Sequence, residues 1–500
     1  MTSRIGAMGS ISNDTNGSYA KPKNAAYGAS ADAPFVTTST QEDPYPYQTG
    51  FGNRFSTEAV PGVLPQGGRN LPQRNQYDLY TEQLNATSFI STRQTMQHLW
   101  FYRIRPAVAH KPLQSLSTKH DMVASFGLHN PYVHFTPFTF EWGPLGQAST
   151  SEPTNFWQGI KTIAGHGDPT LKEGLAVHQY AANVSMGNQA FVNHDGDFMI
   201  IPVQGRLDIQ TELGRMMVRP GELCVIQAGL RFKVVLPDGP AHGYIQEIFG
   251  AHYELPELGP IGSNGLALPK DFEIPIASFD IDSSDWEVVL KLAGELYHYS
   301  QNHTPFDVVG WHGNYAPYKY EMTKILALSS MKDQLDPSAY CILTAKSKIS
   351  GVSLSDFCAF TPKWVNSLDS FRPPYYHRTM ASEMMGMIYG TYAGSSKTLS
   401  PGALTCDNSF VAHGESYQAW KKATSVALEP QFQGEGSLSF MFHMSSHVAV
   451  TKFAMERHAQ TKPPPESLWD DLQGDFLNHL PEINEKLYRA GRQLIEIPSA

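Results

Sequence analysis

Residues 198–227 read FMIIPVQGRLDIQTELGRMMVRPGELCVIQ, and this stretch decides the fold class. Three short apolar or alternating runs, at 198–203, 206–210 and 223–227, predict β-strands. RPGE at 219–222 and PDGP at 237–240 are turn signals, and they recur at intervals suited to antiparallel sheets. The stretch therefore predicts a mostly β protein with jelly-roll-like β-sandwich architecture.

Short apolar runs separated by turn residues continue on both sides of this stretch and suggest two β domains. Residues 43–282 are dense in Gly, Pro and short apolar runs, and we expect them to form a large N-terminal β domain. Helical spacing of Trp286, Val289, Leu290, Ala293 and Leu296 or Tyr297 predicts a helix within 284–300. We expect residues 283–460 to form the second domain, with strands at the following segments: 324–330, 340–345, 356–360 and 437–455.

The two ends of the chain differ from the rest in composition. Residues 1–42 are rich in small and polar residues, so we expect a disordered tail. A mitochondrial transit peptide is the alternative for this segment, but Arg4 is its only arginine and Asp14 interrupts it. Residues 461–500 form a C-terminal tail in which Leu468, Trp469, Leu472 and Phe476 predict a helix.

The composition favours a small-molecule enzyme over a nucleic-acid or membrane protein. The formal net charge is −10, and no Lys/Arg-rich block is present. The 4 cysteines form no CxxC pair, so neither a zinc ribbon nor a disulfide framework is indicated. No apolar run approaches the ~20 residues that span a bilayer. We therefore expect a cytoplasmic protein.

Three residues in the C-terminal part are candidate metal ligands: His377, Glu383 and His413. Two imidazoles and one carboxylate are the set that a mononuclear non-haem Fe(II) oxygenase uses, because they leave one face of the ion open. His377 and Glu383 are six residues apart, which on a straight strand separates them by about 20 Å. Only a turn between them brings both to one ion. In a chain with 19 histidines, spacing alone does not distinguish this site from ordinary polar residues.

The amino-acid sequence around these residues resembles that of the homogentisate 1,2-dioxygenase family. The iron-binding stretch of that family is similar to FRPPYYHRTMASEMMG at 371–386, and a His-Gly pair follows at 413–414. Further blocks in the same order strengthen the resemblance: YQTGFGN at 47–53, YDLYTEQL at 77–84, WFYRIRP at 100–106, LDIQTELGRMMVRPGELCVI at 207–226, LPDGPAHGYI at 236–245, ELPELGPIGSNGLA at 254–267, HTPFDVVGWHGNYAPYKY at 303–320, LTAKS at 343–347 and AVTK at 449–452.

The resemblance implies an activity and a set of site residues. It implies a cupin-type, hexameric, Fe(II)-dependent enzyme that opens the ring of homogentisate with O₂ to give maleylacetoacetate, as in tyrosine and phenylalanine breakdown. His377, Glu383 and His413 match the family's metal ligands. Tyr392 matches a tyrosine that contacts substrate, and Arg378, directly after the first ligand, is placed where a cation could meet a carboxylate. Tyr392, His413 and Arg378 are thus the expected substrate contacts; the alternatives are core packing for Tyr392 and a surface or backbone-pairing role for Arg378.

Three positions depart from the family pattern. Gln334 stands where the family has a histidine that accepts a proton, and an amide cannot serve as a base. Thr379 replaces the usual Asn, and Asp407 replaces another histidine. Two histidines are new, His443 and His447, and four residues apart on one strand they would share a face. Asp407, His443 and His447 are therefore the candidates for the acid–base role, although a solvated face is an equally good reading of the two histidines.

Three readings of function follow from these observations. The first is homogentisate cleavage. The second is ring opening of a related hydroquinone or phenol in a specialised pathway, which the three departures favour. The third is a catalytically weak paralogue that serves as a structural subunit, against which the retained ligand set argues.

Overall fold

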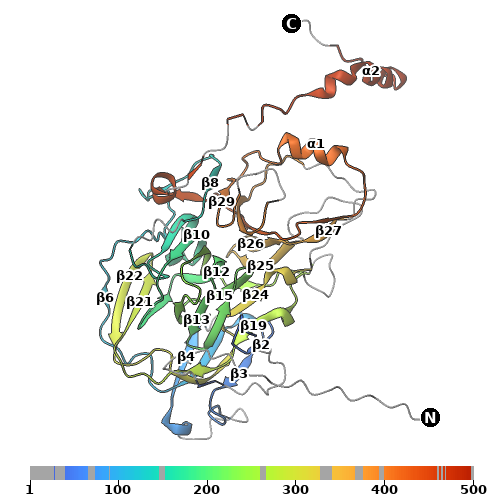
Figure 1. The fold of residues 1–500 in the computed structure, drawn as a ribbon. Helices are drawn as coiled ribbons and strands as arrows, with labels where there is room; N and C mark the ends of the chain where they lie inside the picture. The colour runs from blue at the N-terminus through green and yellow to red at the C-terminus, as the bar shows by residue number, and fades with distance from the viewer. Residues whose placement is uncertain are drawn as a thin grey trace, which may run out of the picture.

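The computed structural model describes residues 27–28, 40–65, 74–88, 91–145, 152–258, 266–326, 340–365, 375–392, 399–458, 461–462, 466–467 and 469–496. Packed β-sheets dominate these residues, and Figure 1 shows β8 from the N-terminal part of the chain beside β29 from the C-terminal part. Almost every strand pairing is antiparallel, and the parallel pairing of β11 with β21 is the exception among the described strands. The predicted mostly β sandwich class is confirmed.

Three sheets build the N-terminal half. The ten-stranded sheet contains β2 (Tyr47–Thr49), β7 (Val133–His134), β9 (Ile160–Asp168), β10 (Glu173–Ala182), β12 (Gly196–Gln204), β15 (Glu222–Ile226), β17 (Ala241–Phe249), β19 (Phe272–Pro275), β24 (Tyr318–Glu321) and β32 (Ala449–Thr451). The seven-stranded sheet contains β6 (Gln114–Ser115), β11 (Gln189–Asn193), β13 (Leu207–Thr211), β14 (Gly214–Val218), β16 (Arg231–Val235), β21 (Trp286–Leu292) and β22 (Glu295–Gln301). The four-stranded sheet contains β3 (Phe55–Glu58), β4 (Tyr80–Asn85), β5 (His98–Arg103) and β23 (Val308–Gly313).

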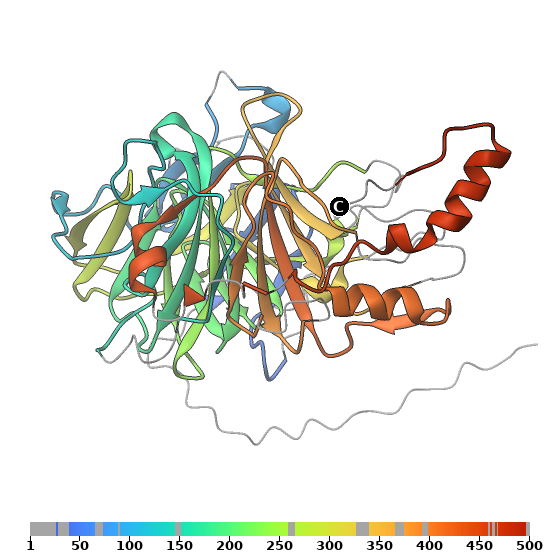
Figure 2. The ribbon, with the colours of Figure 1, turned by 90° about the horizontal axis from the view of Figure 1, so that it is seen from above.

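An eight-stranded sheet forms the C-terminal half. It contains β8 (Phe140–Trp142), β18 (Tyr253–Glu254), β25 (Cys341–Lys346), β26 (Ser353–Phe360), β28 (Ser382–Tyr389), β29 (Leu404–Cys406), β31 (Leu438–Met444) and β33 (Thr461–Lys462). Two small sheets pair β1 (Tyr27–Gly28) with β20 (Ser278–Phe279) and β27 (Lys363–Val365) with β30 (Gln431–Gln433). Two α-helices, α1 (Tyr417–Ser425) and α2 (Leu480–Arg489), belong to the described C-terminal residues, and Figure 2 shows α2 away from the sheets.

One face of the eight-stranded sheet packs against the N-terminal half. Phe440 and Phe442 of β31 are fully buried in the main core, and the ring of Phe440 meets that of Tyr244 edge-on at 4.9 Å. The Tyr244 hydroxyl donates to the carbonyl of Ala403 at 2.6 Å. Because side chains alternate along a strand, Met441 and His443 lie on the opposite face of β31. That opposite face carries the candidate site.

Three expectations about local structure are wrong, and a fourth, the strand at 324–330, is contradicted in the part that the structure describes. The segment 284–300 is not a helix but the hairpin β21–β22, turned by Ala293 and Gly294, whose φ angles are 53° and 81°. The buried run WEVVLKL satisfies helical spacing and strand pairing alike, and only the turn tells them apart. The segment 324–330 begins with the 3₁₀ turn Met322–Lys324, and its residues 327–330 lie outside the described residues. In 437–455, β31 ends at Met444 and a bend precedes β32.

The helix expected in the C-terminal tail is also misplaced, because α2 begins at Leu480, beyond Phe476, and Leu468 lies outside the described residues. The expected boundary at 282/283 also does not follow the sheets, because β21 to β24 complete the N-terminal sheets and the C-terminal sheet resumes at β25. At the other end of the chain, Tyr27 pairs with Phe279, so one point of the N-terminal tail contacts the body.

Candidate metal centre

Two short stretches of paired backbone bring the three candidate ligands together. His377 pairs with His413 through N–H···O bonds of 3.0 and 3.1 Å, and Glu383 pairs with Asp407 through bonds of 2.8 and 2.9 Å. Between His377 and Glu383 the chain turns, and the hydroxyl of Thr379 accepts a hydrogen bond from the N–H of Ala381. The turn required between the first two ligands is therefore present.

The side-chain ends of His377, Glu383 and His413, called here the histidine cluster, converge on one point. Their nitrogen and oxygen atoms all lie within 4.8 Å of one another. His413 Nε2 lies 3.2 Å and His377 Nε2 lies 3.8 Å from Glu383 Oε2. Ligands at right angles around a metal ion, each about 2.1 Å away, are about 3 Å apart. The histidine cluster thus requires only small side-chain movements to hold one divalent ion.

Hydrogen bonding orients one imidazole, and the other has a free nitrogen. The Nδ1 of His413 lies 2.8 Å from the carbonyl of Val411, so this nitrogen donates and Nε2 is left to face Glu383. The Nδ1 of His377 is buried without a hydrogen-bond partner in the described part of the chain. Both rings therefore present Nε2 toward the carboxylate.

Electrostatics bind these groups together in the absence of an ion. Burial disfavours the Glu383 carboxylate, but the hydrogen bond from His413 and the neighbouring imidazoles outweigh it, and the pKa lies below its usual value. Burial likewise opposes a charged His413, yet its bonds to Glu383 and to the Val411 carbonyl raise its pKa to about 9. Among the described residues, only histidines lie within ion-pair distance of Glu383. A metal ion bound to Nε2 of His413 would have to displace a proton from this ring.

The second carboxylate, Asp407, stands directly beside Glu383. Its side chain accepts a hydrogen bond from Thr139 Oγ1 at 3.1 Å. Burial raises the pKa of Asp407 above its usual value, His413 and the Thr139 bond oppose the rise, and the charge of Glu383 adds to it. A carboxylate with a raised pKa is a stronger base than an ordinary aspartate. Thr139 is a site residue that the sequence did not predict, and it comes from a segment distant in the chain.

The structure separates the two new histidines. His443 lies opposite Glu383 in the pairing of β28 with β31, and its Nε2 is 3.8 Å from Glu383 Oε1. His447 lies beyond the end of β31 and lines a separate cavity of about 730 Å³ with Phe410, Met380 and His166. The expectation that both histidines share one strand face is wrong, because the bend at 445–446 interrupts the strand.

The expected substrate contacts Tyr392 and Arg378 differ in burial and in their neighbours. Tyr392 lies against Met385, with its hydroxyl 3.6 Å from the sulfur atom. Burial, followed by the charges of Glu415, Asp407 and Glu383, raises its pKa well above the usual value, so the phenol stays protonated and can donate. Arg378 is exposed and has no ion pair with a described residue. Gln334 lies outside the described residues.

An apolar surface continues from the histidine cluster down the same sheet face. Met385 follows Glu383 by two residues on β28, and Met441 opposite it packs with Cys358 and Cys341. Alternation along β28 and β31 could have predicted these residues from the positions of Glu383 and His443. Met441, Cys358 and Cys341 are buried, so the partly exposed Met385 is the member of this row that a bound ring could contact.

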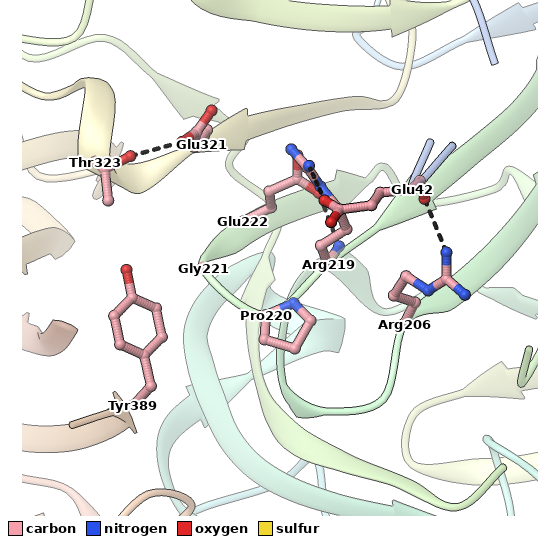
Figure 3. A pocket seen from close by; sticks show the side chains of 9 residues that line it. All are labelled: Glu42, Arg206, Arg219, Pro220, Gly221, Glu222, Glu321, Thr323 and Tyr389. Carbon is pink, nitrogen blue, oxygen red and sulfur yellow. Dashed lines mark hydrogen bonds and ion pairs between the residues drawn. The ribbon is translucent and has the colours of Figure 1, made fainter. Parts of the chain in front are cut away.

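A second cavity, of about 340 Å³, lies at the far end of β28, where Tyr389 forms part of its wall (Figure 3). Arg219 pairs there with Glu222 at 2.8 Å and with Glu42 at 3.3 Å. These arginine–carboxylate pairs lie within the N-terminal half, and Tyr389 faces them from the C-terminal half. The cavity contains no member of the histidine cluster.

The site defines a class before any comparison is made. The chain is a mostly β protein in which two imidazoles and one carboxylate converge near the side chain of Met385. Two imidazoles and one carboxylate are the donor set of mononuclear non-haem metal oxygenases. Comparison with known proteins gives the family. The family model described as homogentisate 1,2-dioxygenase N-terminal matches residues 46–322, and the one described as homogentisate 1,2-dioxygenase C-terminal matches residues 323–476.

Relatives agree along most of the chain. The homogentisate 1,2-dioxygenase of Emericella nidulans is 41% identical over 448 residues, covering 88% of this chain and 98% of that protein. The homogentisate 1,2-dioxygenase of Dictyostelium discoideum is 42% identical over 412 residues, covering 82% of this chain and 93% of that protein. That of Drosophila melanogaster is 41% identical and covers 86% of this chain and 98% of its own length. The chain belongs to the homogentisate 1,2-dioxygenase family.

Proposed function

We propose that this chain is an Fe(II)-dependent dioxygenase that opens the ring of homogentisate with O₂ to give maleylacetoacetate. The observation that carries the proposal is the convergence of His377, Glu383 and His413 within 4.8 Å, in a chain of this family. Retention of all three ligands argues against a role as a purely structural subunit. No helix among the described residues is long and apolar enough to cross a bilayer. By family resemblance the enzyme works as a homo-hexamer in the cytoplasm.

The residues present fit an iron ion. The carboxylate of Glu383 is buried and faces imidazoles alone within the described chain, so the histidine cluster lacks a permanent cation of its own. Two nitrogen donors and one carboxylate oxygen suit Fe(II) and occupy one face of it. When bound, iron supplies the activation of O₂ that no side chain can provide.

The chain's own residues supply positioning and proton transfer. The partly exposed side chain of Met385 contacts the ring, and the protonated phenol of Tyr392 donates a hydrogen bond to a substrate oxygen. Asp407, held by Thr139, is the better placed of the candidate bases, and its carboxylate accepts the proton of a ring hydroxyl. His447 lines the cavity with Phe410 and not the histidine cluster, which supports Asp407 over His447 for this role.

A related hydroquinone is the alternative substrate. Asp407, beside Glu383, is the observation that favours it, because the family pattern has a histidine at that position. Thr379, the other departure in the described chain, accepts the N–H of Ala381 with its hydroxyl and so helps to hold the turn between the ligands.

Oxygen uptake distinguishes these substrates. The protein is reconstituted with Fe(II) without oxygen and then given O₂ with homogentisate or with each of a panel of substituted hydroquinones. We expect homogentisate to give the fastest uptake, with one O₂ consumed per ring opened. Faster uptake with another hydroquinone would move the assignment to the specialised pathway, and iron binding without uptake on any phenol would favour the structural subunit.

A further inference from the structure

The two oxygens of Glu383 face different partners. Oε2 faces the ligand imidazoles, at 3.2 Å from His413 Nε2 and 3.8 Å from His377 Nε2. Oε1 is the oxygen paired with His443, whose Nε2 lies 3.8 Å from it. Oε2 is therefore the oxygen that lies with the imidazoles of the other two candidate ligands.

His443 is fixed in this place by the sheet. It lies directly opposite Glu383 on β28 and directly opposite Asp356 on β26, so its side chain stands between two carboxylate residues on one face. The Asp356 carboxylate accepts a hydrogen bond from Thr344 at 2.6 Å, which gives it a partner of its own. The side chain of His443 is 32% exposed, and its Nε2 is 3.8 Å from Glu383 Oε1, so a hydrogen bond between them requires a small movement of the ring.

His443 is not placed as a ligand itself. Among the described residues, the group whose donor atoms all lie within 4.8 Å of one another comprises His377, Glu383 and His413. His443 is not a member of this group, so its nitrogen lies more than 4.8 Å from at least one of the other donor atoms. Two donors that are each about 2.1 Å from one ion cannot be more than about 4.2 Å apart. It occupies the position of a residue that supports a ligand from behind.

We propose that His443 is a positioning residue: it donates its Nε2–H to Glu383 Oε1 and so keeps that carboxylate coordinated through Oε2 alone. The inference rests on the proposed function, because it concerns the metal that function requires. Carboxylates bind metals through one oxygen or two. A second bond from Glu383 would occupy a position on the open face that substrate and O₂ need.

Cobalt replaces iron in the test, because the visible d–d absorption of Co(II) weakens as its coordination number rises. Wild type, His443→Leu and His443→Gln are loaded with Co(II) alone. We expect His443→Leu to absorb less per bound Co(II) than wild type, since both oxygens of Glu383 then bind. His443→Gln keeps an N–H donor at a similar distance and should retain the wild-type spectrum. In the iron-loaded proteins, kcat of His443→Leu should fall about 10–100-fold.

His298→Leu is the matched control. His298 is 28% exposed and lies 2.7 Å from Glu287 across a strand pair of the N-terminal half. Its loss should leave both readouts unchanged. A His443→Leu spectrum superimposable on wild type would overturn the positioning role alone. Failure of wild type to bind any Co(II) or Fe(II) would overturn the role together with the proposed function.

Discussion

The two halves of the molecule each hold a cluster of histidine and carboxylate, and they differ in what neutralises it. In the N-terminal half, Lys291 Nζ lies 2.6 Å from Asp195 and 2.7 Å from Glu247, and His178 lies 3.2 Å from the same glutamate. These four residues, called here the lysine cluster, are almost completely buried. In the histidine cluster, imidazoles alone face Glu383 among the described residues, and a third of the His377 side chain is exposed.

The comparison shows that similar side chains stabilise the fold in one cluster and form a candidate metal site in the other. A buried carboxylate needs a compensating charge. The lysine cluster has its own in Lys291, and despite burial this ammonium holds the pKa of Glu247 at about 2. The histidine cluster has only titratable rings, so its compensating charge is a proton or an added ion. The first cluster is complete within the fold, and the second is open to a ligand.

The largest expected effect breaks the lysine cluster. Lys291→Met leaves Asp195 and Glu247 buried without a cation, and we expect the free energy of unfolding to fall by about 3–5 kcal/mol. Urea unfolding of the metal-free protein measures it. Iron binding by the folded fraction should not change, because the histidine cluster lies in the other half.

Lys161→Met is the control for that variant. Lys161 pairs with Asp121 at 3.0 Å but is 27% exposed. Its loss should cost no more than about 1 kcal/mol. Equal costs for the two lysines would show that burial does not distinguish the clusters.

Asp407 sharpens the comparison from the chemical side. Asp407→Asn keeps the shape and the backbone pairing with Glu383 but removes the proton acceptor, so kcat on homogentisate should fall about 10²–10⁴-fold. A carboxylate base works above its pKa, so wild-type activity should persist into mild acid and decline as the pH falls through the raised pKa of Asp407. Loss of activity already below about pH 6.5 would point to a histidine base instead.

A smaller effect is the pH dependence of metal binding. His413 holds a proton with a pKa of about 9 in the absence of metal, whereas the Glu383 carboxylate, with its lowered pKa, is already ionised. A metal ion must displace that one proton, so affinity for Co(II) should rise about tenfold per pH unit between about pH 6 and pH 8. Titrations at stepped pH check this. An affinity independent of pH would mean that His413 is neutral before the metal binds.

Strands within residues 198–227 were predictable, because alternation and turn residues are local signals, and β12, β13 and β15 lie where they were expected. The segment 284–300 was not, since a nearly continuous apolar run satisfies two periodicities and the deciding signal is the Ala293–Gly294 turn. The lysine cluster leaves no motif, because β10, β17 and β21 bring its members together only in the fold.

At the site, resemblance to the family's iron-binding stretch predicted His377, Glu383 and His413 as ligands, and the fold brings their side chains together. Thr139 could not be predicted because β8 and β29 meet only through long-range pairing. The different positions of His443 and His447 depend on the bend after Met444. The apolar sequence of 437–455 does not show where that bend lies.

Iron stoichiometry tests the central claim most directly, namely that the histidine cluster holds an ion that the fold itself does not supply. Wild type and His413→Ala are loaded with Fe(II) without oxygen, freed of loose metal and assayed for iron per chain, with melting curves to verify that both are folded. We predict one iron per wild-type chain and an empty or weakly filled site in His413→Ala. Full occupancy in folded His413→Ala would contradict the account.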